Sequence, residues 1–124
     1  MEKKLRSIML VDDEDTLRSM VQNLLCSNGY FVNTASSGKK AIELVADPSN
    51  KIDLVLLDLS MPIMNGEETL REIRKIRPDL KVVLCTGYSE DEVVERFAEL
   101  KLSGILQKPY SLKKLLQQIK DVLV

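Results

Sequence analysis

Four short apolar runs in this chain end in polar or charged side chains. Asp12 and Asp13 follow the first run, and Asp58, Thr86 and Lys108 end the other three. Such runs are typical of buried strands, and a charge at the end of a buried strand is costly unless partners surround it. We therefore expect these five side chains to meet in one site.

The expected site carries more negative than positive charge. Asp12, Asp13 and Asp58 contribute three negative charges, and Lys108 offsets one of them. One Mg²⁺ would supply the remaining positive charge, and carboxylate oxygens are ligands that this ion accepts. Without a metal, crowded carboxylates raise one another's pKa. The residues therefore predict a magnesium site.

Asp58 can act as a nucleophile in this site. A carboxylate can attack phosphorus to form an acyl phosphate, and phosphoryl transfer mainly requires alignment and neutralisation of the phosphoryl oxygens. Lys108 can neutralise those oxygens, and the Thr86 hydroxyl can donate a hydrogen bond to one of them. The set therefore contains what phosphorylation of Asp58 needs.

The rest of the chain predicts the elements that position the site. Apolar runs alternate with amphipathic patterns, which predicts a helix after each of five strands, at 5–11, 30–35, 52–57, 81–85 and about 105–106. This alternation predicts a parallel sheet covered on both faces. The strand order 2-1-3-4-5 places the ends of the first and third strands side by side, where such sheets hold their sites.

The helical patterns also predict helix starts and buried side chains. The stretch from Ser89 to Glu92 is a capping box, Ser111 can cap the last helix, and Cys26 and Cys85 are expected to be small core residues. The expected inward residues are Val93, Val94, Phe97 and Leu100 in the fourth helix and Leu112, Leu115, Leu116, Ile119, Val122 and Leu123 in the last.

Composition limits the class of protein. The 124 residues suffice for a single domain, residues 1–124, with its own core. Because 18 basic residues nearly balance 19 acidic ones, no basic surface predicts direct binding to nucleic acid. The sequence shows neither the run of ~20 apolar residues of a membrane span nor a signal-peptide pattern, so we expect no membrane insertion and a cytoplasmic location.

Five short motifs follow one another along the chain: Asp12-Asp13, Asp58-Leu59-Ser60-Met61-Pro62, Asn65-Gly66, Thr86-Gly87 and Lys108-Pro109. Each motif is weak alone, but their order and spacing are highly specific and cover essentially the whole chain. They closely resemble the receiver domain of two-component response regulators, of the kind found in chemotaxis. The resemblance implies a flavodoxin-like α/β fold, a doubly wound five-stranded parallel sheet of order 2-1-3-4-5 with five helices.

The resemblance implies which residues bind the metal and which accept the phosphoryl group. Asp58 matches the phosphoacceptor, which a sensor histidine kinase or a histidine phosphotransfer protein phosphorylates. Asp13 matches a direct Mg²⁺ ligand, Asp12 a ligand acting largely through water, and the backbone carbonyl of Ser60 the third protein ligand. The implied chemistry is Mg²⁺-dependent self-phosphorylation and self-hydrolysis, without turnover of a dedicated substrate.

The resemblance also implies how the signal is relayed. Thr86 matches the hydroxyl that moves toward the phosphate, and Lys108 matches the lysine that contacts it, followed in the family by a cis bond to proline. The family usually has Tyr or Phe where this chain has Ile105, and isoleucine cannot make the same rotamer exchange. We therefore expect the output to run mainly through Thr86 and residues 87–90, with Tyr88 as a participant.

Other functions remain open at this stage. Ile105 supports a pseudo-receiver that acts by protein binding alone. An aspartate-dependent phosphatase is disfavoured because Ser60 stands where its second Asp would be, and a flavoprotein because no Thr/Ser-rich phosphate loop follows the first strand. The chain could be a stand-alone receiver or a piece of a larger regulator or hybrid kinase. The family's usual partner face is the fourth helix, fifth strand and fifth helix.

Some of the charged stretches have plainer explanations. Asp12 and Asp13 could be an acidic pair at a helix N-terminus, where such residues are favoured. Glu67-Glu68, Glu90-Asp91-Glu92 and Lys113-Lys114 are expected to be solvated helix faces. Tyr110 is expected to pack against the core.

Overall fold

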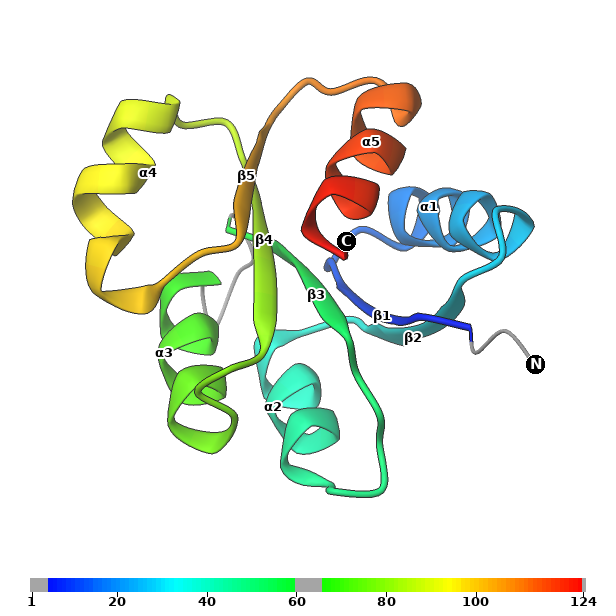
Figure 1. The fold of residues 1–124 in the computed structure, drawn as a ribbon, viewed down its shortest axis with the longest axis horizontal. Helices are drawn as coiled ribbons and strands as arrows, with labels where there is room; N and C mark the ends of the chain where they lie inside the picture. Colours follow the sequence, from blue (N-terminus) through cyan, green and yellow to red (C-terminus); the bar gives the residue numbers. More distant parts are fainter. Residues whose placement is uncertain (1–4, 60–65, 124) are drawn as a thin grey trace.

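The structure, a computed structural model, describes residues 5–59 and 66–123 and alternates strands with helices along the chain (Figure 1). The elements are β1 (Ser7–Val11), α1 (Asp15–Ser27), β2 (Phe31–Ala35), α2 (Gly38–Ala46), β3 (Leu54–Asp58), α3 (Gly66–Ile76), β4 (Lys81–Thr86), α4 (Glu90–Phe97), a short 3-10 turn (Ala98–Leu100), β5 (Gly104–Gln107) and α5 (Leu112–Val122).

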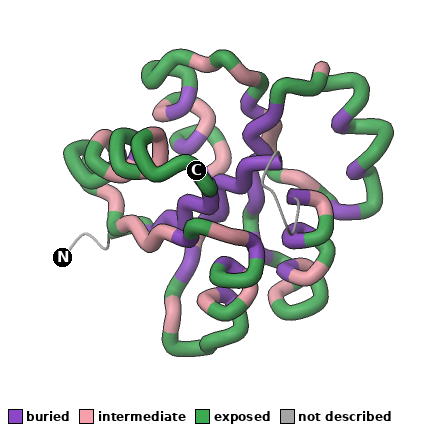
Figure 2. Tube along the Cα trace, turned by 180° about the vertical axis from the view of Figure 1, so that it is seen from behind, coloured by how far each residue is buried: buried purple, intermediate pink, exposed green. Residues whose placement is uncertain are grey.

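The five strands form one parallel sheet in the order β2-β1-β3-β4-β5, which confirms the predicted topology. β1 and β3 are neighbours, with Val11 opposite Leu57, and Asp58 lies opposite Cys85 of β4. Every residue of β1 and β3 is buried, as expected for central strands covered on both faces (Figure 2). The carboxyl ends of β1, β3 and β4 therefore meet at one edge of the sheet.

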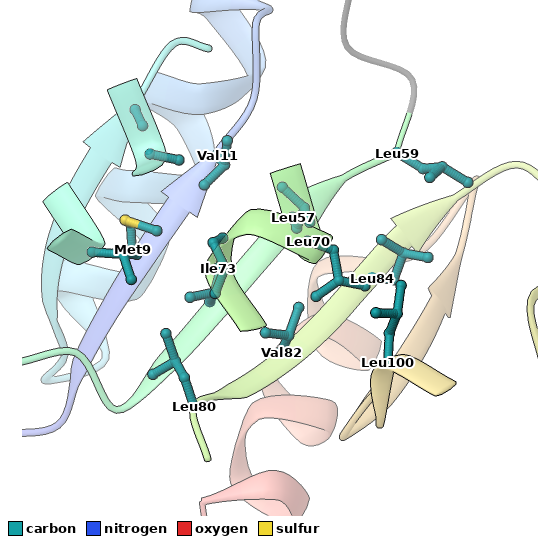
Figure 3. Close-up of a cluster of buried hydrophobic side chains, with 14 of the residues drawn as sticks. Met9, Val11, Leu57, Leu59, Leu70, Ile73, Leu80, Val82, Leu84 and Leu100 are labelled. Atoms are coloured by element: carbon teal, nitrogen blue, oxygen red, sulfur yellow. The ribbon is translucent and has the colours of Figure 1, made fainter. Parts of the chain in front are cut away.

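Helices α1 and α5 cover one face of the sheet, and α2, α3 and α4 cover the other (Figure 1). Because successive strand residues point to opposite faces, Met9 and Val11 belong to the larger core cluster and Ile8 and Leu10 to the smaller one. Figure 3 shows the larger cluster, in which α3 packs on β3 and β4 through Leu70 and Ile73. The two cores fix the sheet between its helices and so fix the strand ends that carry the site.

Serine side chains cap three of the helices. Ser37, Ser89 and Ser111 each accept a hydrogen bond from the backbone N–H three residues later, at 3.2, 3.3 and 3.1 Å. This geometry satisfies one of the backbone donors that the first helical turn leaves without a partner. The predicted caps at Ser89 and Ser111 are confirmed.

Three predictions of burial are wrong, two of them by one helical position. Val94 is 55% exposed and Leu112 is 40% exposed, although both were expected to face inward, and Cys26 is exposed rather than in the core. Neighbouring positions point about 100° apart on a helix. The side chains of Val94 and Cys26 therefore point away from the core, although those of the preceding residues, Val93 and Leu25, are buried.

Arg74 of α3 joins three backbone segments. Its guanidinium group donates to the carbonyl of Leu100 at 2.8 Å, to that of Lys101 at 3.0 Å and to that of Leu80. Leu80 directly precedes β4, whereas Leu100 and Lys101 follow α4. One side chain therefore ties α3 to the segment before β4 and to the segment after α4. No helical pattern signals such a contact.

We predict that Arg74→Met lowers the free energy of unfolding by about 2 kcal/mol, because methionine keeps the aliphatic stem but leaves the carbonyls without their donor. Urea denaturation followed by circular dichroism measures the change. Arg71→Met is the matched control, since Arg71 lies exposed on the same helix. Equal losses in the two variants would contradict the bridging role.

Candidate functional site

The carboxyl ends of β1 and β3 bring three carboxylates together, as predicted. Asp12 directly follows β1, where its backbone N–H donates to the carbonyl of Ala35 at 3.1 Å, and Asp58 is the last residue of β3. One oxygen from each of Asp12, Asp13 and Asp58 lies within 4.8 Å of the others. Asp12 and Asp58 are each only 6% exposed, whereas Asp13 is exposed. The cluster is thus open on the side of Asp13.

The start of α1 holds Asp12 in place. Its side chain accepts a hydrogen bond from the backbone N–H of Glu14 at 2.9 Å, and Arg18 donates to its backbone carbonyl at 2.8 Å. Burial raises the pKa of Asp12, the Glu14 hydrogen bond opposes that rise, and the negative charge of Asp58 adds to it. The charge of Lys108 lowers the pKa of Asp12, and a further cation near this carboxylate would favour its ionised form.

Lys108 supplies a positive charge on the other side of Asp58. Its Nζ donates to Asp58 Oδ1 at 3.1 Å, and its backbone N–H donates to the carbonyl of Thr86 at 2.7 Å. Burial lowers the pKa of Lys108, but the hydrogen bond and the charge of Asp58 outweigh burial and raise it. The peptide bond between Lys108 and Pro109 is cis, as the resemblance implied. Lys108 is therefore a fixed, protonated partner of Asp58.

Thr86 ends β4 and is fully buried beside β3. Its Oγ1 accepts a hydrogen bond from the backbone N–H of Tyr88 at 3.0 Å. A hydroxyl group can accept and donate at the same time, so this contact leaves the Thr86 proton available to a second acceptor. Burial raises the pKa of the adjacent Cys85 thiol to about 12, so Cys85 stays protonated and inert.

The start of α3 lies directly against the end of β3. The backbone N–H of Gly66 donates to the carbonyl of Leu59 at 3.2 Å, and a Cβ at Gly66 would lie 2.5 Å from Leu59 Cα and 2.8 Å from the Asp58 carbonyl oxygen. Only glycine permits this close approach. The predicted ligand Ser60, and Met61, Pro62 and Asn65 of the motifs, lie outside the described residues.

Two contacts near the site were not predicted from the sequence. Arg18 pairs with Asp15 at 2.5 Å, a spacing of three residues that signals such helical pairs. Glu67 was expected on a solvated face, but it is partly buried and accepts a hydrogen bond from Arg96 Nε at 3.0 Å. These residues lie on different helices, 29 positions apart, and no local pattern predicts that pairing.

The donor set fits a divalent cation with a preference for oxygen. Three carboxylates offer one oxygen each within 4.8 Å of one another, close enough to bind one metal ion, and two of these residues are buried. Of the charged partners that the described residues offer, Lys108 alone forms an ion pair with this cluster. A hard dication would balance the remaining charge.

A sequence model of the response regulator receiver domain matches residues 8–120. The chain belongs to the response regulator receiver domain family. It is 38% identical over 117 residues to the sensor kinase CckA of Brucella abortus and 36% identical over 118 residues to the response regulator MprA of Mycolicibacterium vanbaalenii. Both alignments cover 94% of this chain but only 12% and 49% of those proteins.

Solved structures of response regulators resemble this chain along its whole fold. The chemotaxis protein CheY4 of Vibrio cholerae is 26% identical, with a TM-score of 0.88 over 97% of this chain and 100% of that one. The response regulator TrrA of Thermotoga maritima, solved in complex with Mg²⁺-BeF, is 31% identical, with a TM-score of 0.82 over 96% of this chain and 100% of that one. The chain is thus a receiver domain of two-component signalling. No helix in its described part is long and apolar enough to cross a membrane.

We predict that Asp13→Asn raises the free energy of unfolding in the presence of EDTA by on the order of 1 kcal/mol, because it removes one of three mutually repelling charges. Chemical denaturation at neutral pH measures the change. Asp79→Asn is the control, since Asp79 is exposed and precedes β4 at the opposite edge of the sheet. A similar increase in both variants would mean that net charge, and not the cluster, is responsible.

Proposed function

We propose that this receiver domain accepts a phosphoryl group on Asp58. The observation that carries the proposal is the position of its carboxylate, between Asp12 and Asp13 on one side and the Lys108 ammonium at 3.1 Å on the other. A carboxylate oxygen of Asp58 forms a bond to the phosphorus of a phosphohistidine. The bond from phosphorus to the histidine nitrogen breaks, and the electron pair stays on that nitrogen.

The other two carboxylates are less suited to this attack. One Asp12 oxygen accepts the Glu14 N–H, and Asp13 lies at the exposed rim. Asp58 is buried at the strand end, where Lys108 donates to it from the end of β5 and Thr86 ends the neighbouring strand β4. Catalysis of phosphoryl transfer rests mainly on positioning and charge. Asp58 has both.

The charge of the cluster supports a bound Mg²⁺. Asp12, Asp13 and Asp58, with the backbone carbonyl of Ser60 implied by the resemblance, would hold the ion. When bound, Mg²⁺ supplies the positive charge that offsets the phosphoryl oxygens. TrrA, a relative solved with Mg²⁺-BeF, gives a precedent for such occupancy in the family. Lys108 neutralises a further phosphoryl oxygen from the opposite side.

Thr86 then relays the change. Its available proton can be donated to a phosphoryl oxygen on Asp58, and the side chain moves toward that oxygen. Tyr88 follows, because its N–H is bonded to Thr86 Oγ1. Ile105 lies partly buried against the larger core cluster and contributes no aromatic exchange. The output therefore runs through residues 87–90.

The partners follow from this chemistry. The phosphoryl donor is a sensor histidine kinase or a histidine phosphotransfer protein, and the receiver domain meets it in the cytoplasm. An output domain or partner would use the face formed by α4, β5 and α5. Self-phosphorylation from small donors and self-hydrolysis are the only reactions proposed. The complete set of Asp12, Asp13, Asp58, Thr86 and Lys108 argues against a pseudo-receiver.

We expect acetyl phosphate to label the wild-type protein in the presence of Mg²⁺, and Asp58→Asn to lose labelling entirely, because an amide is not a nucleophile at this site. Intact-protein mass spectrometry measures the added phosphoryl group, and EDTA should prevent its appearance. Asp91→Asn, which alters an exposed aspartate of α4, should label as wild type does. Labelling that survives Asp58→Asn would exclude Asp58 as the acceptor.

We expect Thr86→Ala to accept the phosphoryl group but to lose the response of residues 87–90, since alanine offers no hydroxyl to the phosphoryl oxygen or to Tyr88. Amide NMR shifts of this segment, with and without acetyl phosphate, measure the response. Thr86→Ser keeps the hydroxyl and should keep most of the shift. An unaltered response in Thr86→Ala would show that the signal leaves the site by another route.

A further inference from the structure

Arg96 at the end of α4 contacts groups from three segments. Its Nε donates to Glu67 Oε1 of α3 at 3.0 Å, and its guanidinium carbon lies 5.9 Å from the centroid of the Tyr88 ring and 5.6 Å from that of Phe97. The hydrogen bond from Arg96 to Glu67 raises the pKa of the guanidinium group, and the Glu67 charge adds to this rise. One side chain thus joins α3, α4 and the loop between β4 and α4.

The two outer partners of Arg96 each adjoin the phosphorylation site. Glu67 follows Gly66, which packs directly on the backbone of Asp58 and Leu59. Tyr88 donates its N–H to Thr86 Oγ1. Arg96 therefore connects the chain leaving Asp58 with the chain leaving Thr86. Phe97, which is buried in the larger core cluster, anchors this end of α4.

The loop after Thr86 has room to move. A Cβ at Gly87 would meet no atom within 4 Å, and Tyr88 is 47% exposed. Movement of Thr86 toward Asp58 therefore pulls on Tyr88 without a steric barrier at Gly87. Among the described residues, Arg96 contacts the Tyr88 ring, and this contact resists the pull.

We infer that Arg96 is a positioning residue that ties Tyr88 to Glu67 and thereby favours the unphosphorylated conformation of the site. The inference rests on the proposed function of Asp58 and Thr86. An interaction that is stronger in one conformation shifts the equilibrium toward it and weakens any ligand that selects the other. Ile105 of β5 offers no aromatic ring that could respond to movement of Thr86. The contact of the Tyr88 ring with Arg96 links the loop to α4 instead.

Solvent exposure of the Arg96–Glu67 pair limits how strongly it can favour one conformation. The Arg96 and Glu67 side chains are 49% and 22% exposed, and pairs of this kind contribute little alone. A guanidinium group that also lies over aromatic rings gains a further cation–π attraction. We therefore expect a tuning effect on phosphorylation and not an on–off switch.

The test is the affinity for beryllofluoride, a phosphoryl mimic, in the presence of Mg²⁺, measured by amide NMR titration. We expect Arg96→Met and Tyr88→Leu each to bind it roughly three- to tenfold more tightly than wild type. The double variant should bind no more tightly than the tighter single variant, because both remove the same contact. Arg96→Lys, which keeps the charge but loses the planar group, should lie between Arg96→Met and wild type.

Arg71→Met controls for loss of a surface arginine and should bind as wild type does. Unchanged affinity in both single variants overturns the inference, and so do effects that add in the double variant. A lower free energy of unfolding without a change in affinity also overturns it, because Arg96 would then be merely structural. Failure of the wild-type protein to bind beryllofluoride overturns the proposed function itself, together with the inference.

Discussion

The molecule is organised around the burial of like charges at the carboxyl edge of the sheet. Asp12 and Asp58 are nearly inaccessible and share a site with Asp13, while Lys108 offsets a single unit of charge. Crowding three carboxylates with one ammonium group is unfavourable, and burial, together with the charge of Asp58, raises the pKa of Asp12. A neutral side chain in place of one of these carboxylates would make the fold more stable. Their presence makes chemical sense if a dication completes the charge balance of the site.

The rest of the fold keeps these charges from moving apart. Two hydrophobic clusters hold the sheet between its helices, so the carboxylates cannot relax away from one another without disturbing β1 or β3. Gly66 brings α3 against the end of β3, and the backbone N–H of Lys108 is bonded to the Thr86 carbonyl. In the proposed function, rigid strand ends thus carry the reacting groups, and the β4–α4 loop carries the response.

The sequence predicted what depends on local periodicity and on strand ends. Polar residues closing apolar runs located Asp58, Thr86 and Lys108, and the alternation of elements predicted a parallel sheet covered on both faces, because both signals lie within short stretches of chain. The strand order came from the fold class that this alternation favours. Predictions failed where one helical position decides burial, as at Val94. Contacts such as that of Arg96 with Glu67 were not predicted, because they depend on how two helices are placed after folding. Nothing in either helix alone encodes them.

The energy available at the site limits how the signal can be relayed. Moving a two-state equilibrium from 1:99 to 99:1 requires about 5.5 kcal/mol of differential binding. A hydrogen bond from Thr86 to a charged phosphoryl oxygen contributes about 1.5–3 kcal/mol, which is too little alone. In the proposed relay, the Lys108 ammonium would supply part of the remaining difference. In this relay, Thr86 keeps Tyr88 as a donor while it donates to phosphate, so the loop would move with the hydroxyl. The exposed contact of Arg96 with Glu67 would shift this equilibrium without setting it.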